Sequence, residues 1–269
     1  MGALVYSHNM TRRNLVKAAS VAAVAGGGAA AAPRKRSLIE LRFYRLRNGP
    51  VNQGQILREH FAKGRIPALK RAGAGPVGVF SNTIGSGGPY LLMVIGYADF
   101  ATFGAVTERM AADAEYRKSR DEMLAQTQTP YVRMEGMLLR GFETMPAIAV
   151  PSGEGRKSGR LFELRTYESN NMSTLQRKIG MFDNGEIDIF RKSGMEPVFF
   201  GETLFGPNMP NLSYMLAYDD WAAREKCWRA FAGSPEWAKL RSTPGLADNE
   251  IVSNISNVLL SPLPFSDIR

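Results

Sequence analysis

The chain repeats one pattern along its length, and this repeat restricts its possible folds more than any other feature. The segment Leu38–Tyr44 (LIELRFY) returns as Leu161–Tyr167 (LFELRTY). Further along, Phe61 falls on Phe182 and Tyr97 on Tyr218, a constant offset of 121 residues. A single register held over this distance indicates two copies of one folding unit.

Each copy shows the same order of elements. Alternating apolar and polar residues predict strands, and apolar residues at helical spacing predict the helices between them. Gly73 and Gly194 are suited to a left-handed helix end, and Asp99 and Asp220 to a helix start. The predicted strands are Leu38–Leu46, Val77–Thr83, Tyr90–Tyr97 and one near Leu138, then Leu161–Ser169, Val198–Phe205, Leu212–Tyr218 and one near Leu259.

This order is the βαββαβ, or ferredoxin-like, plan. A sheet with helices on only one face must cover its other face, and a second copy in the same chain can do so. We therefore predict an α+β fold of two tandem ferredoxin-like domains that form an intramolecular dimeric α/β barrel. The predicted domains are residues 37–145 and 160–269, joined by a linker at 146–159 that is rich in Pro, Gly and Ser.

Residues 1–36 are predicted to be a twin-arginine signal peptide followed by a basic linker. Arg12 and Arg13 precede a mildly apolar run, Ala18–Ala32, that ends in three alanines. This run is shorter than the roughly 20 residues that span a bilayer. The sequence thus predicts export to the periplasm or beyond, with membrane contact only during transport.

The charge and the reactive residues exclude several classes of function. Without six basic residues of the leader and linker, the net charge falls from +9 to +3, which argues against a nucleic-acid partner. Cys227 is expected to be a buried, inert thiol. His60, the one histidine outside the leader, is expected on a helix surface rather than as a general base. We predict no metal site and no cofactor.

The first strand of each copy carries the candidate site residues. Ile39, Leu41 and Phe43 alternate with Glu40, Arg42 and Tyr44. If the apolar set meets the helices, the polar set points into the barrel, and the second copy follows the same rule. Arg is suited to bind an oxyanion, and a desolvated Glu can act as a base. The candidate catalytic residues are Glu40 and Glu163, and the candidate ligand-binding residues are Arg42, Tyr44, Arg165, Tyr167 and Tyr214.

Simpler interpretations stay open at these positions. Each copy can hold a satisfied Glu–Arg ion pair that only fixes the strand. Met93 and Tyr214, at matching positions of the third strands, could line the interior, but packing is the more usual role of such residues.

Three motifs together resemble the NIPSNAP family. They are the Glu-Leu-Arg-x-Tyr strand, the Tyr-x-Asp-Phe/Trp turn and the stretch Pro235-Glu236-Trp237. The resemblance implies the dimeric α/β-barrel superfamily, which includes small oxygenases, isomerases and stress proteins without a required metal. Many members have a His where Met93 and Tyr214 stand here, so a His-based mechanism is not expected.

Three functions follow as hypotheses. The leading one is a protein that binds a small anionic or polar aromatic ligand between its two sheets. The second is a cofactor-independent monooxygenase or isomerase that uses Glu40 or Glu163 as base. The third is a structural or interaction module with a filled barrel. Whether the protein is an enzyme stays undecided. A monomeric pseudo-dimer and a higher homo-oligomer are both compatible with the duplication.

Overall fold

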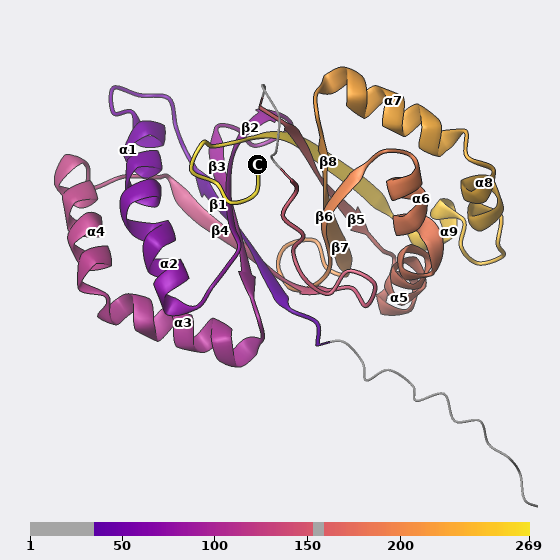
Figure 1. Cartoon of the computed structure of the whole chain (residues 1–269), viewed down its shortest axis with the longest axis horizontal. Coiled ribbons are helices and arrows are strands. Elements are labelled where there is room, and N and C mark those ends of the chain that lie inside the picture. The colour runs from indigo at the N-terminus through magenta and orange to yellow at the C-terminus, as the bar shows by residue number, and fades with distance from the viewer. Residues whose placement is uncertain (1–34, 153–158) are drawn as a thin grey trace, which may run out of the picture. The chain divides into compact units, whose positions relative to one another are not determined.

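A computed structural model describes residues 35–152 and 159–269 (Figure 1). The predicted signal peptide and residues 153–158 of the predicted linker lie outside the described residues. Repeat 1 contains β1 (Leu38–Arg45), α1 (Gln53–His60), η1 (Phe61–Arg65), α2 (Ile66–Ala72), β2 (Val77–Ile84), β3 (Tyr90–Tyr97), α3 (Phe100–Ala112), α4 (Ala114–Gln126) and β4 (Arg133–Gly141). Repeat 2 contains β5 (Leu161–Glu168), α5 (Met172–Met181), η2 (Phe182–Glu186), α6 (Ile187–Lys192), β6 (Glu196–Phe205), β7 (Asn211–Tyr218), α7 (Trp221–Ala232), α8 (Pro235–Arg241), α9 (Asp248–Ile251) and β8 (Asn254–Pro262).

The eight strands form one closed barrel in the order β1-β3-β2-β8-β5-β7-β6-β4, which confirms the predicted architecture. Every neighbouring pair is antiparallel. Two seams join the repeats: β2 pairs with β8, and β4 pairs with β6. The helices of each repeat cover the outside of their own half of the barrel (Figure 1). Closure leaves no free sheet edge.

The barrel interior is filled by apolar side chains from both repeats. Ile39 and Leu41 of β1 belong to this buried cluster, and Phe80 meets Phe162 across it with ring centroids 5.0 Å apart. The predicted direction of the first strands is therefore wrong. Ile39, Leu41 and Phe43 face inward, and the polar set faces the helices.

The predicted helix ends are confirmed where capping decides them. Asp99 accepts a hydrogen bond from the Thr102 amide at 2.8 Å and begins α3, and Asp220 does the same for α7. Gly73 ends α2 with a φ of 99°, a left-handed conformation that glycine adopts without strain. Among the described residues no helix is both long and apolar enough to cross a membrane.

Between α1 and α2 the helix passes through a π-helical segment, η1, and η2 stands at the same place in repeat 2. Segments of this kind redirect side chains and often occur at functional sites. In repeat 1, η1 contributes Phe61 and Arg65 to the space between the helices and the sheet.

Candidate functional site

The same strand motif has two different environments in the two repeats. In repeat 2, Glu163 is fully buried between β5 and α7. Its two oxygens accept six hydrogen bonds of 2.7 to 3.3 Å, from Arg165, Tyr218, Arg224 (two), Trp228 and Asn257. Burial raises the pKa of Glu163, but hydrogen bonds from Arg224 and the charge of Arg165 lower it to about 2. A carboxylate with about four acceptor sites, all engaged, is unsuited to act as a base.

In repeat 1 the matching carboxylate is less occupied. Glu40 accepts from Arg42 Nε at 2.7 Å and from the Tyr97 hydroxyl at 2.8 Å. At the positions that match the donors Arg224, Trp228 and Asn257, repeat 1 has residues that give Glu40 no hydrogen bond among the described residues: Phe103, Thr107 and Gly136. Repeat 1 therefore keeps unused hydrogen-bonding capacity on its first strand.

Repeat 1 also has a pocket of about 240 Å³ between its sheet and its helices. The walls come from β1, α1, η1, α4 and the segment before β4. The polar wall residues are Arg42, Tyr44, His60, Arg65, Tyr116, Arg120 and Tyr131. No acidic side chain lines this wall among the described residues. The pocket therefore combines positive charge with aromatic and apolar surface.

Three arginines line the pocket, Arg42, Arg65 and Arg120, and Arg120 pairs with Asp121 at 2.9 Å. Burial opposes the charge of Arg42, but the adjacent Glu40 outweighs this and raises the pKa of Arg42 above its usual value. Arg65 donates to the Tyr116 hydroxyl at 2.8 Å. Within residues 35–152 and 159–269, Arg65 has no carboxylate partner and its buried Nε has no hydrogen bond. Arg65 can therefore bind and donate hydrogen bonds to the anionic group of a ligand.

Tyr44 adds an unused hydroxyl to the same wall. The side chain is 3% exposed, and its ring packs against Phe61 and Tyr131 with centroids 4.9 and 5.5 Å away. Its hydroxyl makes no hydrogen bond within the described part of the chain, although it lies close enough to Arg42 to help raise the pKa of that arginine. A buried hydroxyl left unpaired costs about 1–3 kcal/mol, which a bound molecule or water can recover.

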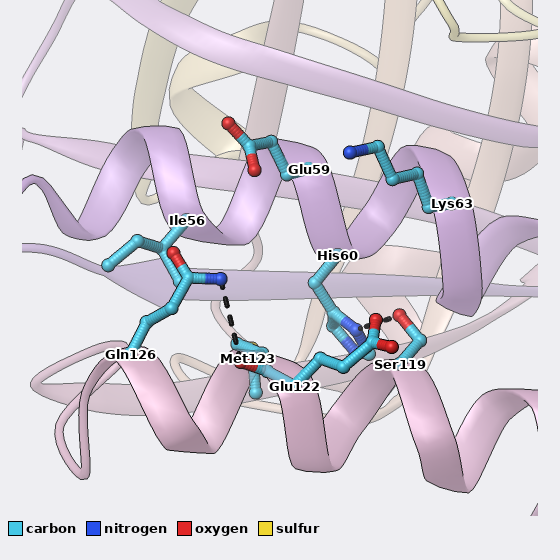
Figure 2. Close-up of a pocket in the computed structure, with 8 residues that line it drawn as sticks. All are labelled: Ile56, Glu59, His60, Lys63, Ser119, Glu122, Met123 and Gln126. Carbon is cyan, nitrogen blue, oxygen red and sulfur yellow. Dashed lines mark hydrogen bonds between the residues drawn. The ribbon is translucent and has the colours of Figure 1, made fainter.

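His60 lies on this wall as well, which corrects its predicted place on a helix surface: it is 7% exposed. Its Nδ1 is 3.0 Å from Ser119 Oγ. Burial and the charge of Arg65 lower the pKa of His60 to about 4, so the ring is neutral at pH 7. His60 also lines a smaller hollow of about 70 Å³, beside Glu59, Ser119 and Glu122 (Figure 2).

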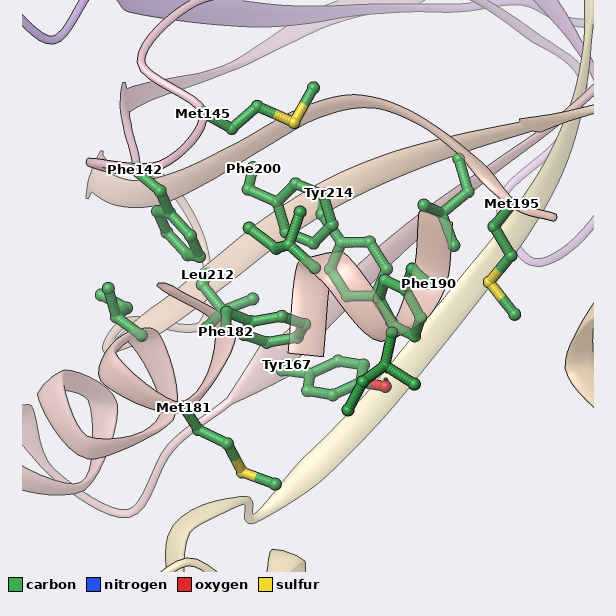
Figure 3. Packing of buried hydrophobic residues seen from close by; sticks show 14 of the residues in the cluster. Phe142, Met145, Tyr167, Met181, Phe182, Phe190, Met195, Phe200, Leu212 and Tyr214 are labelled. Carbon is green, nitrogen blue, oxygen red and sulfur yellow. Dashed lines mark hydrogen bonds between the residues drawn. The ribbon is translucent and has the colours of Figure 1, made fainter. Parts of the chain in front are cut away.

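The matching space in repeat 2 is occupied by side chains of the protein itself. Lys178, which replaces Leu57, is fully buried, and its Nζ lies 3.1 Å from both Glu186 and Asp248. The ammonium also lies 4.9 Å from the centre of the Phe182 ring. Figure 3 shows the packed rings around Phe182, among them Tyr167 and Tyr214. In repeat 2, α8 takes the place of α4 and is shorter. The additional helix α9 brings Asp248 to Lys178.

The NIPSNAP family model matches residues 39–140 and 162–267, one match in each repeat and together most of the chain. The chain belongs to the NIPSNAP family. No curated protein gives a significant match.

Among solved structures, this NIPSNAP chain is similar in fold to two monooxygenase-like proteins. The one from Lactobacillus acidophilus has a TM-score of 0.57 and 10% identity, over 84% of this chain and 94% of that one. The one from Fusobacterium nucleatum has a TM-score of 0.55 and 7% identity, over 86% and 94%. A NIPSNAP family protein of unknown function from Agrobacterium tumefaciens has a TM-score of 0.37 and 16% identity, over 41% and 94%.

The structure divides the predicted site residues of this NIPSNAP protein into two groups. Arg42 and Tyr44 lie together on the pocket wall, with Glu40 bonded to Arg42 behind them. Arg165, Tyr167 and Tyr214 lie on the helix side of repeat 2 and bond to one another at 3.0 to 3.3 Å. None of these residues faces the barrel interior, because in both repeats they lie on the helix side of the sheet. Met93 also faces the helices.

Four polar wall residues were not predicted from the sequence, and only one of them, Arg65, shows a signal there. Arg65 aligns with Glu186, so the charge at this position reverses between the copies. The same alignment sets Leu57 against Lys178, two helical turns earlier. Tyr116, Arg120 and Tyr131 carry no comparable signal. Cys227 is buried as predicted. No group of three potential metal ligands occurs within the part of the chain that the structure describes.

Proposed function

We propose that this NIPSNAP protein binds a small organic anion in the pocket of repeat 1, between the sheet and the helices. The anionic group would bind Arg65 and Arg42, and the Tyr44 hydroxyl would complete its hydrogen bonds. The aromatic and apolar walls favour a ligand with a substantial apolar part. This proposal keeps the predicted ligand class and moves the site from between the two sheets to the helix side of one sheet.

One observation carries the proposal: two buried polar groups on one pocket wall lack partners. The Tyr44 hydroxyl and Arg65 Nε have no hydrogen bond among the described residues, and both belong to side chains that line the pocket. Native proteins leave few buried polar groups unpaired, and those that remain often mark a site for water, an ion or a ligand. The matching side chains of repeat 2, Tyr167 and Glu186, do have partners.

Isothermal titration calorimetry with small aromatic and aliphatic carboxylates tests this proposal. Arg65→Met keeps the apolar stem and removes the charge, so we expect binding to weaken about 10-fold or more. Arg71→Met is the matched control, because Arg71 is an exposed arginine paired with Asp113 outside the pocket. Equal affinities in the wild type and Arg65→Met would refute the proposed site.

A second candidate function is a cofactor-independent monooxygenase. His60 is available to it, because a neutral imidazole on the pocket wall can take a proton from a bound phenol or enol, although burial and Arg65 lower the pKa of His60 to about 4 and make it a weak base. Glu40 is the other possible base. The resulting substrate anion would then react with molecular oxygen. The names of the two monooxygenase-like structures agree with this candidate. Oxygen consumption that survives both His60→Gln and Glu40→Gln would exclude both bases.

Export through the twin-arginine route is part of the same proposal and rests on Arg12, Arg13 and the apolar run after them. Cell fractionation tests it: Arg12→Lys/Arg13→Lys should keep the protein in the cytoplasm. A periplasmic pool unchanged by this double substitution would argue against the route.

A further inference from the structure

The pocket of repeat 1 opens at one end of β4. Met134 is 49% exposed, whereas the other residues of the wall are buried or half-buried. A ligand that enters past Met134 therefore passes over the outer face of β4. The chemistry of this face decides which ligands can extend beyond the pocket.

The outer face of β4 continues the pocket as an open strip. Met134 and Gly136 pair with Tyr44 and Arg42 on β1, and paired residues lie on the same face of a sheet. A Cβ added to Gly136 would meet no atom within 4 Å. Beside Arg42 the strip thus has an empty position rather than a side chain.

The strip is apolar along its length and has a polar end. Leu138 follows on the same face, and a register shift between β4 and β6 sets Phe205, 68% exposed, opposite it. Beyond Leu138 comes Arg140, which pairs with Glu202 at 2.8 Å. From Met134 to Leu138 the strip is about 13 Å long, at about 3.3 Å per residue.

We propose that the ligand is an amphipathic anion whose unbranched apolar tail lies on this strip, from Met134 across Gly136 to Phe205. The inference rests on the proposed anion site, because Arg42 and Arg65 would hold the head group. A tail in this position covers exposed apolar surface at Met134 and Phe205. The Arg140–Glu202 pair sets an upper limit to the useful tail length, because burying an ion pair under an alkyl chain is unfavourable.

Repeat 2 provides an internal comparison. The matching strip on β8 of repeat 2 contains Ile255, 41% exposed, and β2 of repeat 1 sets Ile84, 56% exposed, beside this strip; these two residues correspond to Met134 and Phe205. There, however, Asn257 occupies the position of Gly136 and donates to Glu163 at 3.0 Å. The head-group space beside it holds Lys178. Repeat 2 therefore has the apolar residues without an open position or an anion site.

Calorimetry with a series of straight-chain carboxylates from hexanoate to tetradecanoate, kept below their micelle concentrations, tests the inference. Benzoate is the compact reference. Affinity should rise about twofold to fourfold for each added methylene, the range expected for partly to fully buried groups. The rise should stop once the tail reaches the Arg140–Glu202 pair.

Phe205→Ser should remove the gain for the longest tails and leave benzoate binding unchanged. Ile84→Ser, the matched change beside the β8 strip, should leave the whole series unchanged. Both side chains are exposed, and circular dichroism would verify that both variants fold.

The outcomes separate the two proposals. If benzoate binds but affinity does not rise with chain length, the tail site is refuted and the anion site stands. An equal effect of Phe205→Ser and Ile84→Ser would also refute the tail site. If no member of the series and no benzoate binds, the anion site fails and the tail site with it.

Discussion

Asn257 donates a hydrogen bond from Nδ2 to Oε1 of Glu163 at 3.0 Å, and this bond distinguishes the two halves of the barrel. At the matching position, repeat 1 has Gly136, with open space beside it. One half of the duplicated protein has filled the helix side of its sheet with internal bonds. The other has kept a pocket there, with Arg65 free of any carboxylate among the described residues. Under the proposed function, repeat 2 would stabilise the barrel and repeat 1 would bind the ligand.

Glu163→Gln should lower the free energy of unfolding by about 3–5 kcal/mol at pH 7, because it leaves Arg165 and Arg224 buried without their counter-charge. The folded-state pKa of Glu163, about 2, lies below its ordinary value of 4.5. Its stabilisation is therefore complete above pH 4.5 and is lost as the pH falls towards 2. Urea unfolding of the wild type and Glu163→Gln would measure the difference in their free energies of unfolding, which should be smaller at pH 3 than at pH 7.

Glu40→Gln is the matched control for this prediction. Glu40 accepts from Arg42 and Tyr97, so its loss should cost less, about 1–3 kcal/mol. Equal costs at the two positions would contradict the division of roles between the repeats.

Lys178→Met should destabilise the protein by about 1–3 kcal/mol, because Glu186, whose pKa burial raises to about 7, would stay buried without a cation and take up a proton. The double variant Lys178→Met/Glu186→Leu removes both charges and should recover most of this loss. Chemical unfolding of the two single variants and the double variant gives the coupling free energy. Simple additivity of the two single effects would show that the buried pair is not coupled.

His60 should make the protein less stable in mild acid. Its folded-state pKa, about 4, lies below its ordinary value of 6.5, so the unfolded chain binds more protons between these values. Stability attributable to His60 is therefore present above pH 6.5 and falls by up to about 3 kcal/mol as the pH drops to 4.

His60→Gln removes this titration, so the variant should lose less stability than the wild type between pH 6.5 and 4. Other groups that titrate in this range affect both proteins, and their contribution cancels in the comparison. Parallel stability–pH profiles of the two proteins would contradict a buried, neutral His60.

The repeat made the barrel predictable. The offset that aligns Phe61 with Phe182 also aligns the strands and the caps Asp99 and Asp220, and the structure confirms all of these. The alternation in β1 separates two sets of side chains but does not say which set faces inward. Both faces of the sheet are covered, one by helices and one by the other sheet, so burial alone cannot distinguish them.

The polar set faces the helices because the helices supply its partners. Arg224 and Trp228 stand four residues apart on α7 and point at Glu163 together. The barrel interior, enclosed by strands alone, holds the apolar set. The i, i+4 spacing of two long donors on one helix was the sequence signal for this arrangement. The pocket itself had no such signal, because it depends on how α4 and the segment before β4 lie over η1.

Tyr44→Phe and Tyr167→Phe remove the same hydroxyl from the two repeats. They therefore test whether repeat 1 binds the ligand and repeat 2 stabilises the fold. The Tyr44 hydroxyl has no partner among the described residues, so its removal should leave the free energy of unfolding unchanged or raise it by up to about 1 kcal/mol. The Tyr167 hydroxyl bonds to Tyr214 and Arg165, so its removal should cost about 1–2 kcal/mol.

For the affinity of carboxylates, Tyr44→Phe should have the larger effect, the reverse of the order expected for stability. Tyr44→Phe removes a hydrogen bond to the ligand and should weaken binding about fivefold to tenfold, whereas Tyr167→Phe should leave it unchanged. Thermal unfolding and calorimetry on the same two preparations measure both effects. A loss of binding with Tyr167→Phe alone would place the site in repeat 2 and reverse the assignment.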